Sequence, residues 1–353
     1  MHANVTARFA KAICFFRLRS LPFPMDLTAI TFTELRYLLA LADTGHFGKA
    51  AAKCFVTQPT LSAQLKKLEE NLGVQLVERT PRGAQLTPIG QQVVAHARVI
   101  LEHVQAIGDA ALGHSDPLAG ELHLGVIPTL GPYFLPKVLV PLQHTFPRLR
   151  LFVEEQITAV LLEHLLNHQL DAALLALPVD ASGVEALPLF DEPFWVLVPR
   201  NHPLTKKACI READLEGQNV LLLTEGHCLR EQALSLCMKH NAQVAGDFRA
   251  TSLETLRHLV AAGYGCTLIP ELAVSSLGDG KTVVRPLVGA EARRRIGLVW
   301  RKSYPRPESI AALGNFFRTE MARAGLSIPR QGQDSESDRP DARGALGVKR
   351  PSR

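Results

Sequence analysis

The sequence has few of the features that mark membrane, secreted or metal-binding proteins. No stretch approaches about 18 uninterrupted apolar residues, so we expect no membrane-spanning helix and no membrane partner. Six cysteines in 353 residues do not make a disulfide framework, and the absence of a C-x-x-C pair argues against zinc. Residues 1–25 carry only a short apolar patch with no small-residue cleavage site after it, which argues against a secretory signal. These absences predict a cytoplasmic protein with reduced thiols.

Composition and charge narrow the class further. Hydrophobic residues make up 46% and charged residues 21%, as in an average globular protein, and the length suggests two or three domains. Of the net charge of +5, four positive charges lie in residues 1–25 and a net two lie in residues 327–353, which leaves −1 for the rest. The overall charge therefore gives no support for nucleic-acid binding. We expect residues 1–28, an N-terminal extension, and the tail 327–353 to be disordered.

Residues 32–76 have the apolar spacing of three short helices, with a tight turn at Phe55-Val56 before the third. Four leucines of the third helix form a stripe about 60° wide at 100° per residue, which leaves small, polar and basic residues outward. Such a face suits the major groove of DNA, and a following basic turn would form a wing against phosphates. A generic three-helix module with a solvated face is the alternative. The candidate DNA-binding residues are Thr57, Gln58, Pro59, Thr60, Ser62, Lys66, Lys67, Arg79 and Arg82.

Residues 87–113 predict one longer helix, with Thr87 as its N-cap and Pro88 at its first position. Its apolar residues alternate spacings of four and three, which makes a heptad seam long enough for one partner helix. The seam residues expected to mediate dimerisation are Val93, Ala97, Ile100, Val104 and Ile107.

After Pro117, short β runs alternate with helical stretches of about 10–15 residues, a pattern typical of α/β domains with parallel sheets. The length of this part predicts two α/β lobes with a cleft between them. The expected strands are 122–127, 149–153, 172–177, 195–198, 220–223, 267–269 and 296–300.

Three runs in the N-terminal part identify a family: Phe47-Gly48-Lys49-Ala50-Ala51-Ala52, Thr57-Gln58-Pro59-Thr60-Leu61-Ser62 and Leu68-Glu69-Glu70-Asn71-Leu72-Gly73. With Thr87-Pro88-Ile89-Gly90, they resemble the winged helix-turn-helix of LysR-type transcriptional regulators. The resemblance covers about residues 29–325. It implies promoter DNA as a partner, dimerisation through the linker helix and a two-lobed effector domain of Rossmann-like, periplasmic-binding-protein-like fold. The domains expected on this basis are 29–87, 88–116 and 117–326, the last divided into 117–191 plus 294–326 and 192–293.

Cys228 follows turn residues and would lie at the N-terminus of a helix that runs to about His240. Helix N-termini favour anions, and His227 and Arg230 add donors, so we expect a lowered pKa for the Cys228 thiol. A thiolate there could attack an O–O bond, with Cys237 as a possible resolving thiol. Two unrelated helix cysteines are the alternative.

The run Gly226-His227-Cys228-Leu229-Arg230 is similar to the redox-cysteine segment of the hydrogen-peroxide sensors within the LysR family. Ile127-Pro128-Thr129-Leu130-Gly131 and Gln156-Ile157-Thr158 extend this similarity. The resemblance implies that Cys228 and Cys237 are the redox cysteines. It also implies a peroxide pocket, for which the candidates are Thr129, Thr158, His227 and Arg230.

The remaining chemistry-bearing residues have bland interpretations. Cys54 and Cys266 fit packing roles, Cys209 fits an exposed site, and His164 and His168 fit a solvated helix face without a third ligand. Gly263-Tyr264-Gly265 lacks the third glycine of a dinucleotide loop, and no P-loop or G-x-S-x-G occurs. We therefore expect no metal and no cofactor.

Together these features predict a non-enzymatic regulator in which peroxide oxidises Cys228 and a Cys228–Cys237 disulfide forms. On an intact helix the two Cα atoms would stand about 13.5 Å apart, whereas a disulfide needs about 4.4–6.8 Å, so the helix must unwind. The resemblance implies a tetramer, activation through RNA polymerase and reduction by a glutaredoxin or thioredoxin. The rival hypotheses are a LysR-type regulator with a small organic effector in the interlobe cleft and a thiol peroxidase.

Overall fold

The computed structural model describes residues 30–81, 83–111, 116–244, 248, 250–277 and 280–329. The expectations for residues 1–28, for Arg82 and for residues 330–353 lie outside these described residues. Contacts divide the chain into two compact units, residues 1–104 and 105–353, which are described separately below. No helix in the described ranges is long and apolar enough to span a bilayer.

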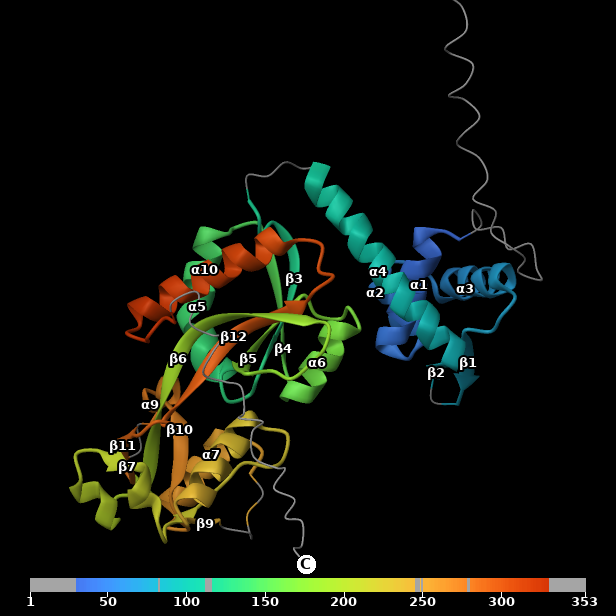
Figure 1. The fold of residues 1–353 in the computed structure, drawn as a ribbon. Coiled ribbons are helices and arrows are strands. Elements are labelled where there is room, and N and C mark those ends of the chain that lie inside the picture. The colour runs from blue at the N-terminus through green and yellow to red at the C-terminus, as the bar shows by residue number, and fades with distance from the viewer. Residues whose placement is uncertain are drawn as a thin grey trace, which may run out of the picture. The chain divides into compact units, whose positions relative to one another are not determined.

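The N-terminal unit contains three short helices followed by a two-stranded antiparallel hairpin (Figure 1). Thr31 and Glu34 form a capping box at the first helix, and Thr57 Oγ1 accepts a hydrogen bond from Thr60 N at the third. Leu61, Leu65 and Leu68 are buried, so the predicted leucine stripe and the wing are confirmed. The elements are α1 (Phe32–Thr44), α2 (Phe47–Lys53), α3 (Gln58–Leu72), β1 (Val77–Thr80) and β2 (Gly83–Leu86).

The predicted long helix is α4 (Pro88–Ala111). Thr87 Oγ1 accepts from Gly90 N at 3.0 Å and donates to Gln75 O at 2.8 Å, so Thr87 caps α4 and ties its start to the loop before β1. The N-cap and the proline at the first position were both predicted correctly.

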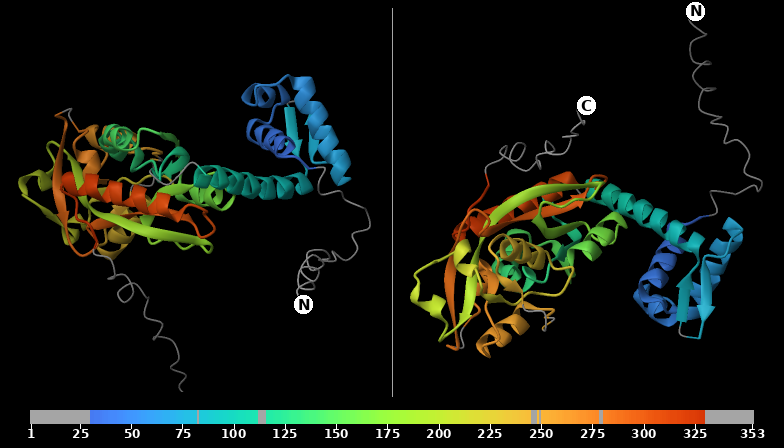
Figure 2. Two further views of the ribbon diagram at one scale, coloured as in Figure 1. Left: turned by 90° about the horizontal axis from the view of Figure 1, so that it is seen from above. Right: turned by 60° about the horizontal axis from the view of Figure 1, so that its bottom comes forward.

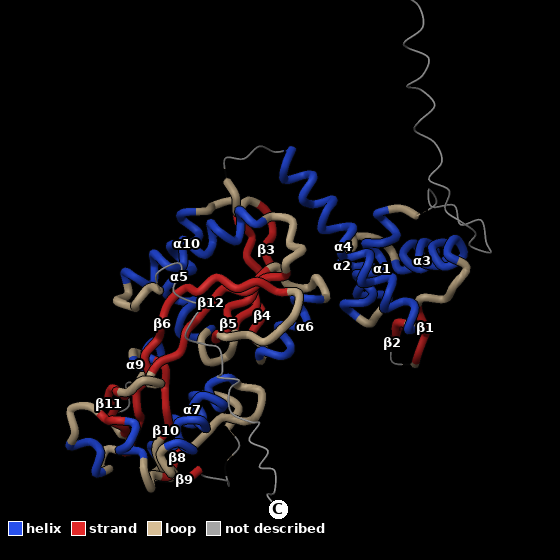
Figure 3. The backbone as a smooth tube through the Cα atoms, viewed as in Figure 1, coloured by secondary structure: helices blue, strands red, loops and turns tan. Residues whose placement is uncertain are grey.

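The α/β part of the chain, residues 116–329, contains one eight-stranded mixed sheet with strand order β4-β3-β5-β12-β6-β11-β7, and β10 also pairs with β6. Figure 3 shows the strands against the helices that cover them. The strands and helices of the α/β part are β3 (Gly120–Val126), α5 (Gly131–Thr145), β4 (Leu149–Glu155), α6 (Thr158–Leu166), β5 (Ala172–Leu177), β6 (Val184–Pro199), β7 (Ile210–Arg211), β8 (Asn219–Val220), α7 (Cys228–Lys239), β9 (Gln243–Val244), α8 (Leu253–Ala261), β10 (Thr267–Pro270), α9 (Glu271–Val274), β11 (Thr282–Val288), β12 (Arg293–Arg301) and α10 (Pro307–Arg323).

The sheet is mixed, so the expectation of parallel sheets is confirmed for only part of it. The β3–β4 and β3–β5 pairs are parallel, but β12 runs antiparallel to both β5 and β6, and β6 pairs antiparallel with β10 and β11. The cause is the length of β6: its 16 residues pass through both lobes, and β12 returns along it (Figure 2). The expected strand 220–223 is also shorter, because regular pairing in β8 stops at Val220.

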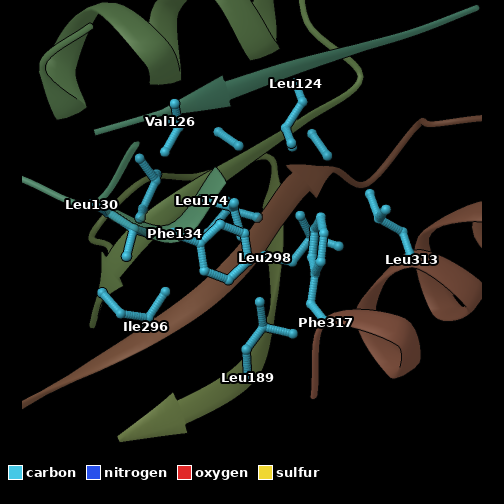
Figure 4. Packing of buried hydrophobic residues seen from close by; sticks show 14 of the residues in the cluster. Leu124, Val126, Leu130, Phe134, Leu174, Leu189, Ile296, Leu298, Leu313 and Phe317 are labelled. Atoms are coloured by element: carbon cyan, nitrogen blue, oxygen red, sulfur yellow. The ribbon is translucent and has the colours of Figure 1, made fainter. Parts of the chain in front are cut away.

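Two hydrophobic cores define the lobes. The first-lobe core combines β3, α5, β5 and α10, with Phe134 and Phe317 in edge-to-face contact at 5.1 Å between centroids (Figure 4). The second-lobe core consists of buried residues from the stretch 194–292. β6 contributes to both cores and β12 to the first-lobe core, and the paired stretch between the cores carries charged residues that include Asp191, Glu192, Arg294 and Arg295. The lobes are therefore joined by a charged crossing of two paired strands.

Candidate functional site

A tight turn at Gly226 places the start of α7, which belongs to the second lobe, against the first lobe. Before it, Thr224 N donates to Ala250 O at 2.8 Å, which fixes the end of the buried segment 221–223. Gly226 has a φ of 90°, and a Cβ there would lie 2.9 Å from Ile157 Cδ1, so both conformation and space favour glycine. The next two residues, His227 and Cys228, are thereby brought against the first lobe.

Three loops meet at a narrow pocket in front of the Cys228 sulfur. Its walls are Ile127, Pro128 and Thr129 after β3, Ile157 and Thr158 after β4, and Gly226, His227 and Cys228. The structure thus brings together four residues singled out in the sequence, namely Thr129, Thr158, His227 and Cys228. Arg230 does not line this pocket, because its Nη1 donates to Leu223 O at 2.9 Å. In this conformation Arg230 therefore lies outside the pocket lining.

Arg294 supplies the positive charge that sequence reasoning assigned to other residues. It is fully buried on β12, donates from Nη1 to Thr129 Oγ1 at 2.8 Å and from Nη2 to Thr129 O at 3.0 Å. Its Nε donates to Glu192 Oε2 at 2.9 Å, and Glu192 Oε1 accepts from Leu272 N at 3.0 Å. Both charges are therefore paired and hydrogen-bonded, as buried charges require.

The electrostatics of the pocket differ from the expectation. Burial raises the pKa of the Cys228 thiol above its ordinary value, so the prediction of a lowered pKa is wrong for this conformation. Arg294, the backbone N–H groups of Cys228 and Leu229, and the Thr158 hydroxyl act in the opposite direction and favour the thiolate. The first lobe, which covers the sulfur, is the source of burial that the local sequence could not reveal.

His227 and Thr158 offer buried polar atoms toward the pocket. Burial lowers the pKa of His227, which keeps its imidazole neutral at neutral pH. Its Nδ1 and the Thr158 Oγ1 have no conventional hydrogen-bond partner among the described residues. Thr129 Oγ1 accepts from Arg294, so its hydroxyl proton remains available. The pocket therefore presents polar atoms beside the sulfur, and in this conformation it is closed to a water-sized molecule.

Cys237 lies on the same helix as Cys228 but far from the pocket. The stretch between them is helical, as predicted, so a rise of 1.5 Å per residue separates the two Cα atoms by about 13.5 Å. Cys237 is buried in the second-lobe core, where burial raises its pKa to about 11. The two thiols cannot join unless α7 loses most of its helical form.

The candidate DNA-binding face is exposed on α3 and the hairpin. Thr57, Gln58, Pro59, Thr60, Lys66 and Lys67 are exposed, and Ser62 is half-buried. The Arg79 guanidinium bonds Ser62 Oγ and lies 4.5 Å from the centroid of Phe47, so the wing is fixed to the helices. Lys67 pairs with the buried Glu34 and Lys66 with Glu70, each at 3.5 Å.

The seam of α4 is buried at its start and open further along. Ala97 is buried and Val93 packs against the N-terminal core, whereas Ile100 is 42% exposed and Ile107 is 70% exposed. Val104 is half-buried. Exposed isoleucines on one helix are the feature that pairing with a second helix would cover.

The other cysteines and histidines have the following surroundings. Cys54 packs against the N-terminal core, Cys209 is exposed, and Cys266 is buried immediately before β10. His164 Nδ1 contacts Glu154 Oε1 at 3.0 Å. α6 ends at Leu166 and His168 has a φ of 56°, so His168 lies beyond the helix and does not share the expected helix face with His164.

Comparisons with known proteins agree with this architecture. Residues 32–91 match the bacterial regulatory helix-turn-helix proteins of the lysR family, and residues 115–322 match the LysR substrate binding domain. The DNA-binding transcriptional dual regulator OxyR of Escherichia coli (strain K12) is 43% identical over 290 residues, which are 82% of this chain and 95% of the relative. The hydrogen peroxide-inducible genes activator of Haemophilus influenzae is 41% identical over 77% of this chain and 91% of the relative.

Solved structures give the same picture. A full-length OxyR variant of Pseudomonas aeruginosa is 42% identical with a TM-score of 0.69, covering 82% of this chain and 97% of the other. An H2O2-bound mutant of Corynebacterium glutamicum OxyR is 34% identical with a TM-score of 0.58, covering 85% and 99%. The oxidised form of OxyR has a TM-score of 0.55 at 41% identity, covering 59% and 98%.

Proposed function

The chain belongs to the LysR family of bacterial transcriptional regulators, and we propose that it uses the pocket at the start of α7 to sense hydrogen peroxide and control oxidative-stress genes. The family resemblance predicted from its helix-turn-helix and effector motifs is confirmed. The protein is a DNA-binding regulator and not an enzyme.

The proposal rests on one observation: a thiol and a hydroxyl that accepts a hydrogen bond from a buried arginine meet in one narrow pocket. The Cys228 thiolate attacks one peroxide oxygen, the O–O bond breaks and the other oxygen leaves as hydroxide, which takes up a proton. Thr129 can donate a hydrogen bond to the leaving oxygen, because its own oxygen accepts from Arg294. The Cys237 thiol then displaces water from the Cys228 sulfenic acid, and a disulfide forms.

The H2O2-bound and oxidised structures of relatives support this assignment, since their chains align with most or all of the α/β part. Loss of the α7 helix is the conformational signal, because one covalent bond then forces a backbone change that a neighbouring subunit can detect. Regulated DNA binding would follow from that change.

The wider assembly follows from the same proposal. The exposed α4 isoleucines support a dimer, and we place two such dimers in a tetramer on promoter DNA. RNA polymerase is the proposed partner in activation, a glutaredoxin or thioredoxin is the proposed reductant, and the cytoplasm is the proposed location. The proposed domains remain 29–87, 88–116 and 117–326.

Peroxide titration of the full chain, with and without a thiol reductant, tests the function. We expect one Cys228–Cys237 disulfide per chain and one peroxide consumed, with Cys209→Ser as the control that leaves both unchanged. Continuous consumption in the presence of reductant would indicate a thiol peroxidase. Unreactive thiols would favour a small organic effector, for which a cleft of about 470 Å³ beside Cys228 offers room.

A further inference from the structure

Another buried cysteine, Cys266, belongs to the same hydrophobic core as Cys237. Cys266 and Cys237 are each 1% exposed, and both belong to the core of the second lobe. Burial, together with the charge that a thiolate on Cys237 would carry, raises the pKa of Cys266 to about 12. The peroxide pocket makes no use of this pair, because Cys266 lies outside it.

Backbone bonds hold the two thiols on adjoining layers. Cys266 N donates to Asn219 O in β8 at 2.9 Å, and its Sγ lies 3.6 Å from the same oxygen. At the end of α7, Cys237 O accepts from Ala242 N at 2.9 Å, immediately before β9, which pairs with β8. α7 contacts β9 and lies near it in Figure 3. The helical form of α7 thus keeps Cys237 next to the strands that adjoin Cys266.

A disulfide from Cys237 to Cys228 and one from Cys237 to Cys266 therefore require different conformations of α7. Pairing with Cys228 requires the helix to unwind, because about 13.5 Å separates the two Cα atoms along it. Cys237 and Cys266, in contrast, belong to one core while α7 is helical, so their pairing does not require the separation along the helix to be closed.

Building on the proposed peroxide function, we propose that Cys266 attacks the Cys228–Cys237 disulfide and converts it into a Cys237–Cys266 disulfide. The Cys266 thiolate attacks Sγ of Cys237, the bond to Cys228 breaks, and Cys228 leaves with the electron pair as a thiolate. The proton released by Cys266 ends on Cys228 or in solvent. No oxidant or reductant is consumed, and the chain remains oxidised by two electrons.

The surroundings of the thiols favour this direction of exchange. Burial raises the pKa of all three thiols, but of the three only Cys228 has a positive charge beside it, Arg294, which with the N–H groups at the start of α7 favours its departure as the thiolate. Release of Cys228 lets α7 refold and bury Leu229, Ala233 and Leu236 again. The exchange ends the unwound, signalling conformation without an external reductant, and Cys237 stays unavailable until the new bond is reduced.

Time-resolved disulfide mapping of the full chain after a peroxide pulse tests the exchange. We expect the Cys228–Cys237 peptide first, followed by Cys237–Cys266 with Cys228 open to alkylation. Cys266→Ala should stop at the first disulfide and keep it several-fold longer, whereas Cys209→Ala, at an exposed cysteine, should behave as wild type. A Cys228–Cys237 bond that persists equally in wild type and Cys266→Ala would overturn the exchange. Failure of that first bond to form would instead overturn the proposed function.

A second experiment keeps Cys266 and tests the geometry directly. In Cys228→Ser, oxidation by diamide should join Cys237 to Cys266 while amide exchange across residues 228–239 stays as slow as in the reduced protein. If Cys237 and Cys266 both remained free thiols after this treatment, the proposal would be contradicted. A Cys237–Cys266 linkage accompanied by fast amide exchange in α7 would also contradict it.

Discussion

Arg294 donates a 2.8 Å hydrogen bond from Nη1 to the hydroxyl of Thr129, and both side chains are buried. This bond orients the Thr129 proton and brings a positive charge to the pocket of Cys228. Because the same guanidinium is paired with Glu192 on β6, the electrostatics of the pocket depend on the two strands that join the lobes. Movement of one lobe against the other would therefore alter the reactivity of the thiol.

Arg294→Met should slow the reaction of Cys228 with peroxide and also destabilise the fold. Loss of the guanidinium leaves Glu192 charged and buried, which typically costs about 3–5 kcal/mol. Adding Glu192→Gln should recover much of the stability, because the uncompensated charge is gone, but should not recover the rate. Urea unfolding and stopped-flow oxidation measure the two effects. A double variant with wild-type rate would exclude Arg294 from the chemistry.

The rate of Cys228 alkylation should keep rising with pH up to values above the usual pKa of a thiol. Burial raises the pKa of Cys228 above its usual 9.0, and only the thiolate reacts, so the rate should grow about tenfold per pH unit below that pKa. The Cys237→Ser and Cys209→Ser variants leave Cys228 in place and identify its signal. A rate that levels off well below pH 9.0 would contradict the raised pKa.

Local signals in the sequence were sufficient for the helices, because caps such as Thr57 and Thr87 lie beside the segments they start. They did not identify the buried ion pair. Arg294 stands in a run of three arginines that resembles a solvated turn, and only the long β12 reveals that it shares a face with the buried Ile296. Glu192 likewise shares a face of β6 with the buried Phe190 and Phe194, each two residues away.

Buried residues thus recur every second position around both Arg294 and Glu192. This pattern could be recognised as strand only once β6 and β12 were known to be longer than the strands predicted from the sequence. The raised pKa of Cys228 has a similar origin. The N-terminal position on α7 was predictable from the turn before it, whereas the burial comes from Ile157 and Thr158, about 70 residues earlier in the chain.

Lys66→Ala should weaken promoter binding and reduce the salt dependence of binding by about one unit of slope, as expected for one lost phosphate contact. Lys66 is exposed on α3, and its 3.5 Å contact with Glu70 is a surface pair that DNA can displace. Lys206→Ala, at an exposed lysine of the α/β part, is the charge-matched control. Equal affinity and slope in both variants would remove this face of α3 from the interface.

Ile100→Glu should dissociate the dimer while the α/β part stays folded. Ile100 is 42% exposed on α4, so the charge is tolerated in a single chain but would be desolvated against a partner helix. Gln92→Glu places the same charge at an exposed polar position of α4 and should leave assembly unchanged. Sedimentation velocity distinguishes the two variants, and an Ile100→Glu protein that sediments as wild type would refute the seam.

The redox switch makes different demands on its two cysteines. Cys228→Ser should abolish the response to peroxide, because serine is not ionised at neutral pH and forms no sulfenic acid. Cys237→Ser should still allow oxidation of Cys228, which stops at the sulfenic acid and leaves α7 helical. Amide exchange across residues 228–239 should therefore accelerate after peroxide in wild type only, because the disulfide cannot span about 13.5 Å of intact helix. Identical exchange in reduced and oxidised wild type, with the Cys228–Cys237 bond present, would mean that the bond forms without unwinding. In that case α7 could not carry the signal.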